Sequence, residues 1–128
     1  MGPYEKILCD ANVLYRAYRA SIKASKWKEA TQRYMLSYLK NIFDLKKDIR
    51  CRTLTNGPAS EFILMERGKV RPITSICLKD RIIRHAICDE IFMPILKNKL
   101  IYDNGSSITG KGLAHQRARF LVHLRRYY

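Results

Sequence analysis

The stretch FILMERGKVRPITSI, residues 62–76, decides which fold the sequence predicts. Two apolar runs, 62–65 and 70–76, flank a short connection that contains Gly68. Glycine adopts positive φ with little strain, so this spacing predicts a β-hairpin that turns at Gly68. Pro72 has no backbone N–H, and its strand is therefore expected at a sheet edge or with its N–H side uncovered.

Helical patterns flank the hairpin on both sides. Apolar residues at three- and four-residue spacing predict one helix over residues 4–24 and another over 27–49. After the hairpin, a helix is expected to open near Asp80, whose carboxylate would cap its first N–H groups. Pro94 is expected to end or kink that helix. A final amphipathic helix is predicted over 113–128, so the fold class is α+β, mainly helical with one β-hairpin.

The predicted elements form one partial domain over residues 1–128. Residues 1–50 make a helical amino-terminal region, and residues 60–128 supply the hairpin, a helix, a Gly-rich loop and the final helix. The final helix carries Leu121 and Leu124 on an apolar side and shows no glycine, asparagine or proline stop signal. We therefore expect the chain to be the amino-terminal part of a larger protein, and we expect this apolar strip to favour a homodimer.

The chain is strongly basic. Its 128 residues contain 25 Lys and Arg against 11 Asp and Glu, which gives a net charge of +14 and a pI near 9.9. Small domains that need charge only for solubility carry a net charge of about 2–8. The excess predicts a polyanionic partner, and nucleic acid is favoured. The alternative is a basic surface that meets an acidic face elsewhere in the parent protein.

The four cysteines are scattered and do not form the close pairs that metal sites use. His85, His115 and His123 do not supply such pairs either, so no metal site is predicted. The start of the chain has no apolar signal-peptide region, and no apolar run approaches the roughly 20 residues that cross a bilayer. These features lead us to expect a cytoplasmic protein with no membrane partner.

The segment GSSITGKG, residues 105–112, satisfies the first part of a phosphate-binding P-loop. The final position of that motif should be Ser or Thr, which reaches a magnesium ion, but the chain has Gly112 there. A P-loop should also follow a buried strand, which the preceding residues do not provide, so we reject an ATPase. A weaker role stays open, because backbone N–H groups of a Gly-rich loop at a helix start attract phosphate and Lys111 adds positive charge.

The basic residues of the hairpin are more specific candidates for phosphate binding. Alternation along a strand puts Lys69 and Arg71 on the same face. Two cations at this spacing can straddle a triphosphate or adjacent backbone phosphates. Taken alone, the simpler explanation is a solvated strand face. The helix that follows adds Asp80-Arg81, with Arg84 three residues later, close to the predicted hairpin in sequence.

Taken in order, residues 62–124 resemble the amino-terminal sequence blocks of bacterial retroelement reverse transcriptases, of the group II intron type and their phage-associated relatives. The shared pattern is an apolar strand, a Gly-Lys-x-Arg-x-Ile turn and strand, an Asp-Arg helix start, a proline near the end of that helix and a Gly-x-Gly loop. Here the strand begins at Phe62, the turn follows at Gly68, and the pattern continues through Asp80 and Pro94 to Gly112. The loop lacks the Arg-Pro of the commoner group II pattern, so the subfamily stays open.

The resemblance implies that the chain is most of the fingers subdomain of a right-hand polymerase. It implies that Lys69 and Arg71 contact the triphosphate of the incoming nucleotide. It also implies contacts of Arg81 and Lys111 with the template strand or the nucleotide pocket. We expect Arg67 and Arg84 to take part with them in binding RNA and single-stranded or hybrid nucleic acid. The palm and thumb of the parent protein would be further partners.

The parent enzyme would be an RNA-directed DNA polymerase, a nucleotidyltransferase that uses Mg²⁺ held by converging carboxylates. The acidic residues of this chain are few and dispersed along the sequence. We therefore expect this chain alone to contain no catalytic residue, to hold no metal or other cofactor and to lack polymerase activity. Two alternatives stay open for its function, a stand-alone basic RNA-binding module and an oligomerisation element.

Overall fold

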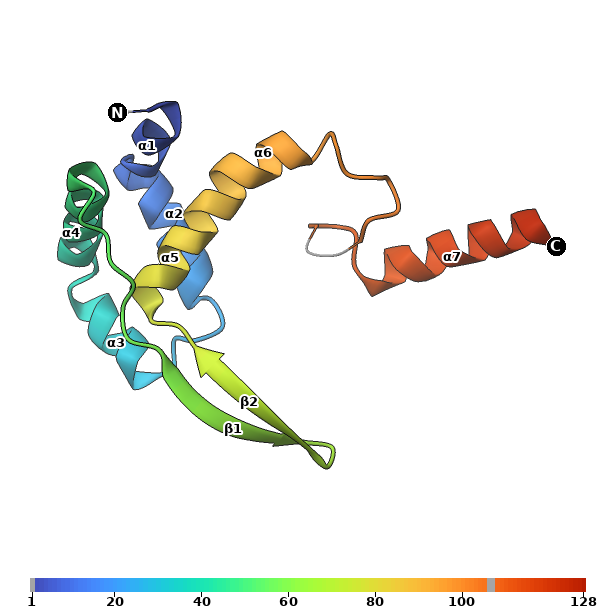
Figure 1. The fold of residues 1–128 in the computed structure, drawn as a ribbon, viewed down its shortest axis with the longest axis horizontal. Helices are drawn as coiled ribbons and strands as arrows, with labels where there is room; N and C mark the ends of the chain where they lie inside the picture. Colours follow the sequence, from blue (N-terminus) through green and yellow to red (C-terminus); the bar gives the residue numbers. More distant parts are fainter. Residues whose placement is uncertain (1, 106–107) are drawn as a thin grey trace. The chain divides into compact units, whose positions relative to one another are not determined.

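The computed structural model describes residues 2–105 and 108–128. Over these residues the protein is a mainly helical α+β structure with one two-stranded antiparallel hairpin (Figure 1). The predicted fold class is confirmed at this level. The chain forms two compact units, Met1–Pro94 and Ile95–Tyr128.

The first unit begins with four helices, continues with the hairpin and ends with a further helical segment. Its elements are α1 (Pro3–Leu8), α2 (Ala11–Ile22), α3 (Glu29–Leu36), α4 (Tyr38–Cys51), β1 (Ser60–Glu66), β2 (Lys69–Ser75), α5 (Leu78–Ile87) and the π-helical turn η1 (Cys88–Phe92). The short helix α6 (Met93–Leu96) spans the boundary, and α7 (Leu113–Tyr127) belongs to the second unit. Within the described ranges, no helix combines the length and the apolar character needed to cross a membrane.

Both amino-terminal helices that were predicted to be continuous are interrupted. The helix expected over 4–24 breaks at Asp10, whose carboxylate accepts a hydrogen bond of 2.9 Å from the backbone N–H of Asn12 and so starts α2. The helix expected over 27–49 breaks at Ser37, whose φ of −125° and ψ of 31° are not helical. The prediction of single helices is therefore wrong in both places.

The core of the first unit forms where α2, α4 and α5 meet. Leu14 of α2 and Ile82 of α5 are each 0% exposed, and Leu45 of α4 is 1% exposed. Complete burial of an aliphatic side chain of this size stabilises the fold by about 1.5–3 kcal/mol. These contacts hold α5 in place, and α5 follows directly after the hairpin.

Four tyrosines extend this core. Tyr18 is buried, and its ring stacks on that of Tyr38 with centroids 5.5 Å apart and planes 4° apart. The Tyr34 ring also stacks on Tyr18, with centroids 6.1 Å apart, and the centroid of the Tyr15 ring lies 6.1 Å from that of Tyr38. The rings pack on one another, as aromatic side chains at helical spacing do when they belong to a core.

Asp80 has a different role from the one expected. It is the third residue of α5, is buried, and makes no cap at the start of the helix. Its two carboxylate oxygens instead accept hydrogen bonds of 3.0 and 3.3 Å from the backbone N–H of Gly57, 23 residues earlier. Asp80 therefore attaches the segment before β1 to α5, and this contact fixes one side of the base of the hairpin.

The hairpin itself is confirmed, including its turn. The strands pair in the register Glu66↔Lys69 to Ser60↔Ser75, so Arg67 and Gly68 alone form the turn. Both have positive φ, 51° for Arg67 and 74° for Gly68, as a two-residue type I′ turn requires. In a two-stranded sheet each strand is an edge, which suits Pro72. In Figure 1 the paired strands project away from the helices of the same unit.

The helix after the hairpin passes Pro94 instead of ending before it. The α-helical pattern stops at Ile87, a π-helical turn follows, and helical structure resumes from Met93 to Leu96 (Figure 1). A proline inside a regular α-helix clashes with the carbonyl four residues earlier, and a wider turn before it relieves that clash. The predicted interruption is present, but it lies in the π-helical turn ahead of Pro94.

Candidate nucleic-acid interface

One face of the hairpin carries a small group of charged side chains. The observed register places Lys69 and Arg71 on the same face of β2, as strand alternation predicts, with Glu66 directly opposite Lys69. Arg71 also forms an ion pair with Glu66, with 3.1 Å between its Nη1 atom and the carboxylate Oε2 atom. We name Glu66, Lys69 and Arg71 the hairpin clamp.

The ion pair within the hairpin clamp is weak enough to be exchanged. The side chains of Arg71 and Glu66 are 57% and 51% exposed. Exposed pairs of this kind contribute about 0–1 kcal/mol, because water screens them. Arg71 can therefore break its ion pair with Glu66 and pair with a phosphate group instead. The sequence reasoning missed Glu66, although a two-residue turn at Arg67-Gly68 would have placed it opposite Lys69.

The other face of the hairpin carries apolar side chains that are open to solvent. Ile63, Met65 and Val70 lie on this face and are 69%, 74% and 63% exposed. Arg67 lies at the turn between the two faces. The hairpin thus presents its basic residues on one face and at the turn, and exposed apolar residues on the other face.

Two further predicted residues lie on α5, the helix that follows the hairpin. Arg81 and Arg84 are both on α5, three residues apart, so they share one side of that helix. Arg81 is half-buried and Arg84 is exposed. Lys79, which was not predicted, is held by an ion pair with Asp48 of α4 at 2.7 Å. The first unit therefore brings five of the six predicted cations onto the hairpin and the helix that follows it.

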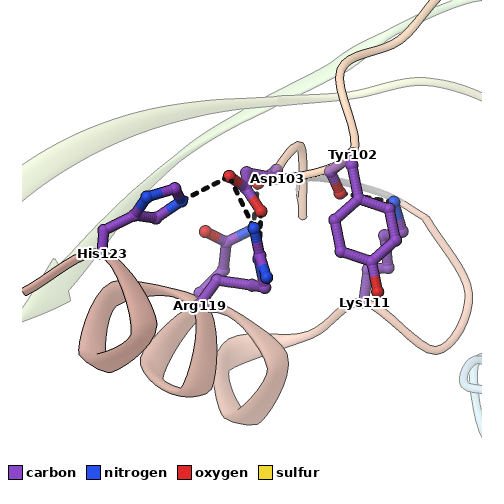
Figure 2. A network of polar contacts seen from close by, with 6 residues as sticks. Tyr102, Asp103, Lys111, Arg119 and His123 are labelled. Carbon is purple, nitrogen blue, oxygen red and sulfur yellow. Dashed lines mark hydrogen bonds and ion pairs between the residues drawn. The ribbon is translucent and has the colours of Figure 1, made fainter. Parts of the chain in front are cut away.

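The sixth predicted residue, Lys111, belongs to the second unit. Its ammonium group donates a hydrogen bond of 2.6 Å to the backbone carbonyl of Tyr102 and lies 4.4 Å from the centre of the Tyr102 ring (Figure 2). The guanidinium of Arg119 lies 5.0 Å from the same ring. Lys111 thus stabilises its own loop. A contact with nucleic acid through Lys111 stays a prediction.

Asp103 organises the second unit. Figure 2 shows its carboxylate between Arg119 and His123, which lie four residues apart on α7. Arg119 and His123 both bond to this carboxylate, the latter at 2.7 Å, and the side-chain amide of Gln116 donates to the Asp103 carbonyl at 2.7 Å. Hydrogen bonds from Arg119 first, and then from His123, lower the pKa of Asp103 to about 2. The loop is therefore attached to α7 by a group that stays ionised.

This attachment should weaken in acid. The lowered pKa means that ionised Asp103 stabilises the folded loop above the ordinary carboxyl pKa of about 3.9, and that this contribution is lost as the pH falls from there towards about 2. We expect the hydrogen-exchange protection of the loop amides next to Asp103 to fall over that interval. Asp103→Asn should show the lower protection at every pH. Asp89→Asn, on η1 in the first unit, is the control, and equal protection in both variants would contradict the prediction.

Phosphate binding by the glycine-rich segment 105–112 stays a prediction. Ser106 and Ser107, which belong to the motif considered above, lie outside the described residues.

The predicted final helix is present as α7, and Phe120, Leu121 and Leu124 are 65%, 48% and 42% exposed on it. Self-association through this apolar strip stays a prediction.

The described carboxylates do not fit the magnesium ions that the resemblance implies. No group of three or more His, Cys, Asp or Glu side chains converges within residues 2–105 and 108–128. Asp48, Glu66, Asp80 and Asp103 each bond to a different basic or backbone group of the protein. We therefore derive no catalytic step through a metal ion held by these residues.

Comparison with models of known protein families gives no match, and comparison with curated proteins gives none either.

Proposed function

We propose that the chain is the fingers part of an RNA-directed DNA polymerase of the reverse transcriptase type. In this role it would bind template or primer nucleic acid and the triphosphate of an incoming nucleotide. The observation that supports this most is the hairpin clamp, in which Lys69 and Arg71 lie side by side on one face of a projecting hairpin. The net charge of +14 supports a polyanionic partner independently of the hairpin.

The geometry of the hairpin clamp suits phosphate groups. Residues two apart on a strand are separated by about 6.8 Å, since each residue advances the strand by about 3.4 Å. Lys69 offers a compact ammonium, whereas Arg71 offers a planar guanidinium that can bind two oxygens at once. Together they can neutralise neighbouring phosphates on one ligand. Phosphoryl transfer depends largely on such positioning and charge neutralisation.

Salt titration tests the binding part of the proposal. We expect the chain to bind single-stranded RNA or DNA with little sequence preference, and its affinity to fall steeply as salt is raised. Each phosphate neutralised on a single strand contributes a slope of about −0.7 in log affinity against log salt. Fluorescence anisotropy with labelled oligonucleotides measures this slope, and an affinity that does not change with salt would contradict the proposal.

Glu66→Gln should strengthen nucleic-acid binding. The change removes the carboxylate that now pairs with Arg71, and with it a negative charge beside the phosphates. We expect the affinity for single-stranded RNA to rise about twofold to fivefold, in line with the small free energy of an exposed ion pair. Glu61→Gln is the matched control, because Glu61 lies on the same strand but on its opposite face. An equal gain in both variants would show that only net charge matters.

A further inference from the structure

The outer edge of β1 carries backbone groups that can pair with a further strand. A two-residue turn is closed by a hydrogen-bonded pair, here Glu66 and Lys69, and hydrogen-bonded and non-hydrogen-bonded pairs then alternate along the ladder. Residues of the non-hydrogen-bonded pairs direct their N–H and C=O groups away from the partner strand. On β1 these residues are Glu61, Ile63 and Met65. Among the described residues no third strand pairs with them.

The outer edge of β2 differs because it contains Pro72. This proline lies opposite Ile63 in a non-hydrogen-bonded pair, so the N–H that it lacks is one that would point outward. The ladder inside the hairpin is therefore intact, whereas the outer edge of β2 cannot form a continuous ladder with another strand. The hairpin thus has one edge that can accept a strand and one edge that cannot.

The side chains of β1 also suit a partner strand. Four consecutive residues of this strand, 62–65, are large, apolar and exposed. The cations of the paired strands, Lys69 and Arg71, are both on β2, one strand farther from the open edge. An exposed apolar edge of this kind is a template for pairing with another chain. A strand added to β1 would cover apolar side chains without lying next to the cations of β2.

A second copy of β1 fits this edge in an antiparallel register centred on Ile63. Ile63 then lies opposite Ile63 of the second copy, and Glu61 lies opposite Met65 of the second copy. All three residues direct their backbone groups outward, so each of them joins the new ladder. The same register places Phe62 opposite Leu64 of the second copy, an aromatic–aliphatic pair. A register shifted by two residues would leave one of the three outward-directed residues unpaired.

We infer that the outer edge of β1 pairs with the same edge of a second copy of the chain, which forms a symmetric dimer with a four-stranded antiparallel sheet. The two-fold symmetry closes the assembly, and Pro72 on each outermost strand prevents the addition of further strands. The pairing requires no nucleic acid, so this inference goes beyond the proposed function and does not depend on it. The two hairpin clamps would lie on one face of the sheet, on its outermost strands.

The test measures association of the intact chain by sedimentation velocity over a range of protein concentrations. Ile63→Lys places two like charges directly opposite each other on the two-fold axis. Val70→Lys is the matched control, because Val70 is similarly exposed and lies on the same face of the hairpin but on β2. Pro72→Val restores the outward N–H of β2, and Leu121→Lys disrupts the apolar strip of α7. Circular dichroism and thermal unfolding identify any variant that fails to fold.

We expect a reversible dimer of the wild-type chain, since an interface of this kind is at the small end of specific interfaces. Ile63→Lys should weaken dimerisation at least about tenfold, and Val70→Lys should change it by less than about threefold. Pro72→Val should associate beyond the dimer, which tests the open edge without any change to β1. Because each copy carries a net charge of +14, added salt should strengthen the dimer, whereas it should weaken binding to nucleic acid.

Three results would overturn the inference. The first is a wild-type chain that stays monomeric at every concentration and salt level. The second is an equal loss of dimer in Ile63→Lys and Val70→Lys, which would show that only added charge matters. The third is a dimer that is kept in Ile63→Lys and lost in Leu121→Lys, which would place the interface on α7.

Discussion

Replacing Lys69 and Arg71 together with alanine is expected to weaken binding of single-stranded nucleic acid about tenfold to a hundredfold. Both cations lie on one face of β2 and would act on neighbouring phosphates of one ligand. Charge-assisted contacts of this type contribute about 1.5–3 kcal/mol each, and solvent exposure reduces that value. The salt slope should also become shallower by about 1.4, the contribution of two phosphate contacts on a single strand.

The matched control for this variant is Lys47→Ala with Arg50→Ala, which removes two exposed cations from α4. An equal loss in both double variants would mean that only net charge matters, and would remove the hairpin clamp from the site. If the proposed function holds, each single change, Lys69→Ala or Arg71→Ala, should impair nucleotide use by the complete polymerase about tenfold to a hundredfold. Primer extension against nucleotide concentration measures this, and unchanged KM and kcat would refute the assignment.

Leu14→Ala and Ile82→Ala are expected to have the largest effects on stability. Each side chain is 0% exposed, one on α2 and the other on α5, within the same hydrophobic cluster. Removing a large aliphatic side chain from a packed core lowers the free energy of unfolding by about 2–5 kcal/mol. Small domains are stable by only about 5–15 kcal/mol, so either change should shift the urea midpoint strongly.

Leu39→Ala provides the control for these core variants. Leu39 is on α4 but is 57% exposed, so its loss should change the free energy of unfolding by no more than about 0.5 kcal/mol. Circular dichroism during urea unfolding measures all three variants. If Leu14→Ala and Ile82→Ala unfold at the same urea concentration as Leu39→Ala, the helices do not pack as described.

Local chemistry explains which parts of this fold could be predicted. The hairpin follows from neighbouring residues, since Gly68 permits the turn and strand alternation sets the faces. The break at Asp10 also had a local signal, an aspartate two residues before the donor N–H that it caps. The break at Ser37 had none, because the Ser37 side chain makes no capping hydrogen bond. Apolar spacing alone does not distinguish one long helix from two short ones.

Contacts between distant segments explain what could not be predicted. Asp80 has the sequence context of a helix cap, but it bonds instead to Gly57, 23 residues away, and only the folded chain brings these two together. The same is true of Asp103 and its partner Arg119, 16 residues later. Strand alternation placed Lys69 beside Arg71, whereas no sequence pattern indicated that the Tyr34 hydroxyl would be buried without a hydrogen-bond partner among the described residues.

The left-handed backbone conformation of Arg67 allows the effect of this residue on folding to be separated from its effect on ligand binding. Its φ of 51° is a conformation that asparagine, aspartate and glycine adopt with less strain than arginine does. Arg67→Asn should therefore keep or improve the hairpin while it removes the cation from the tip. Under the proposed function, arginine at this position disfavours its own turn and favours contact with the ligand. Differences at residue 67 among natural variants would then reflect ligand preference more than the stability of the fold.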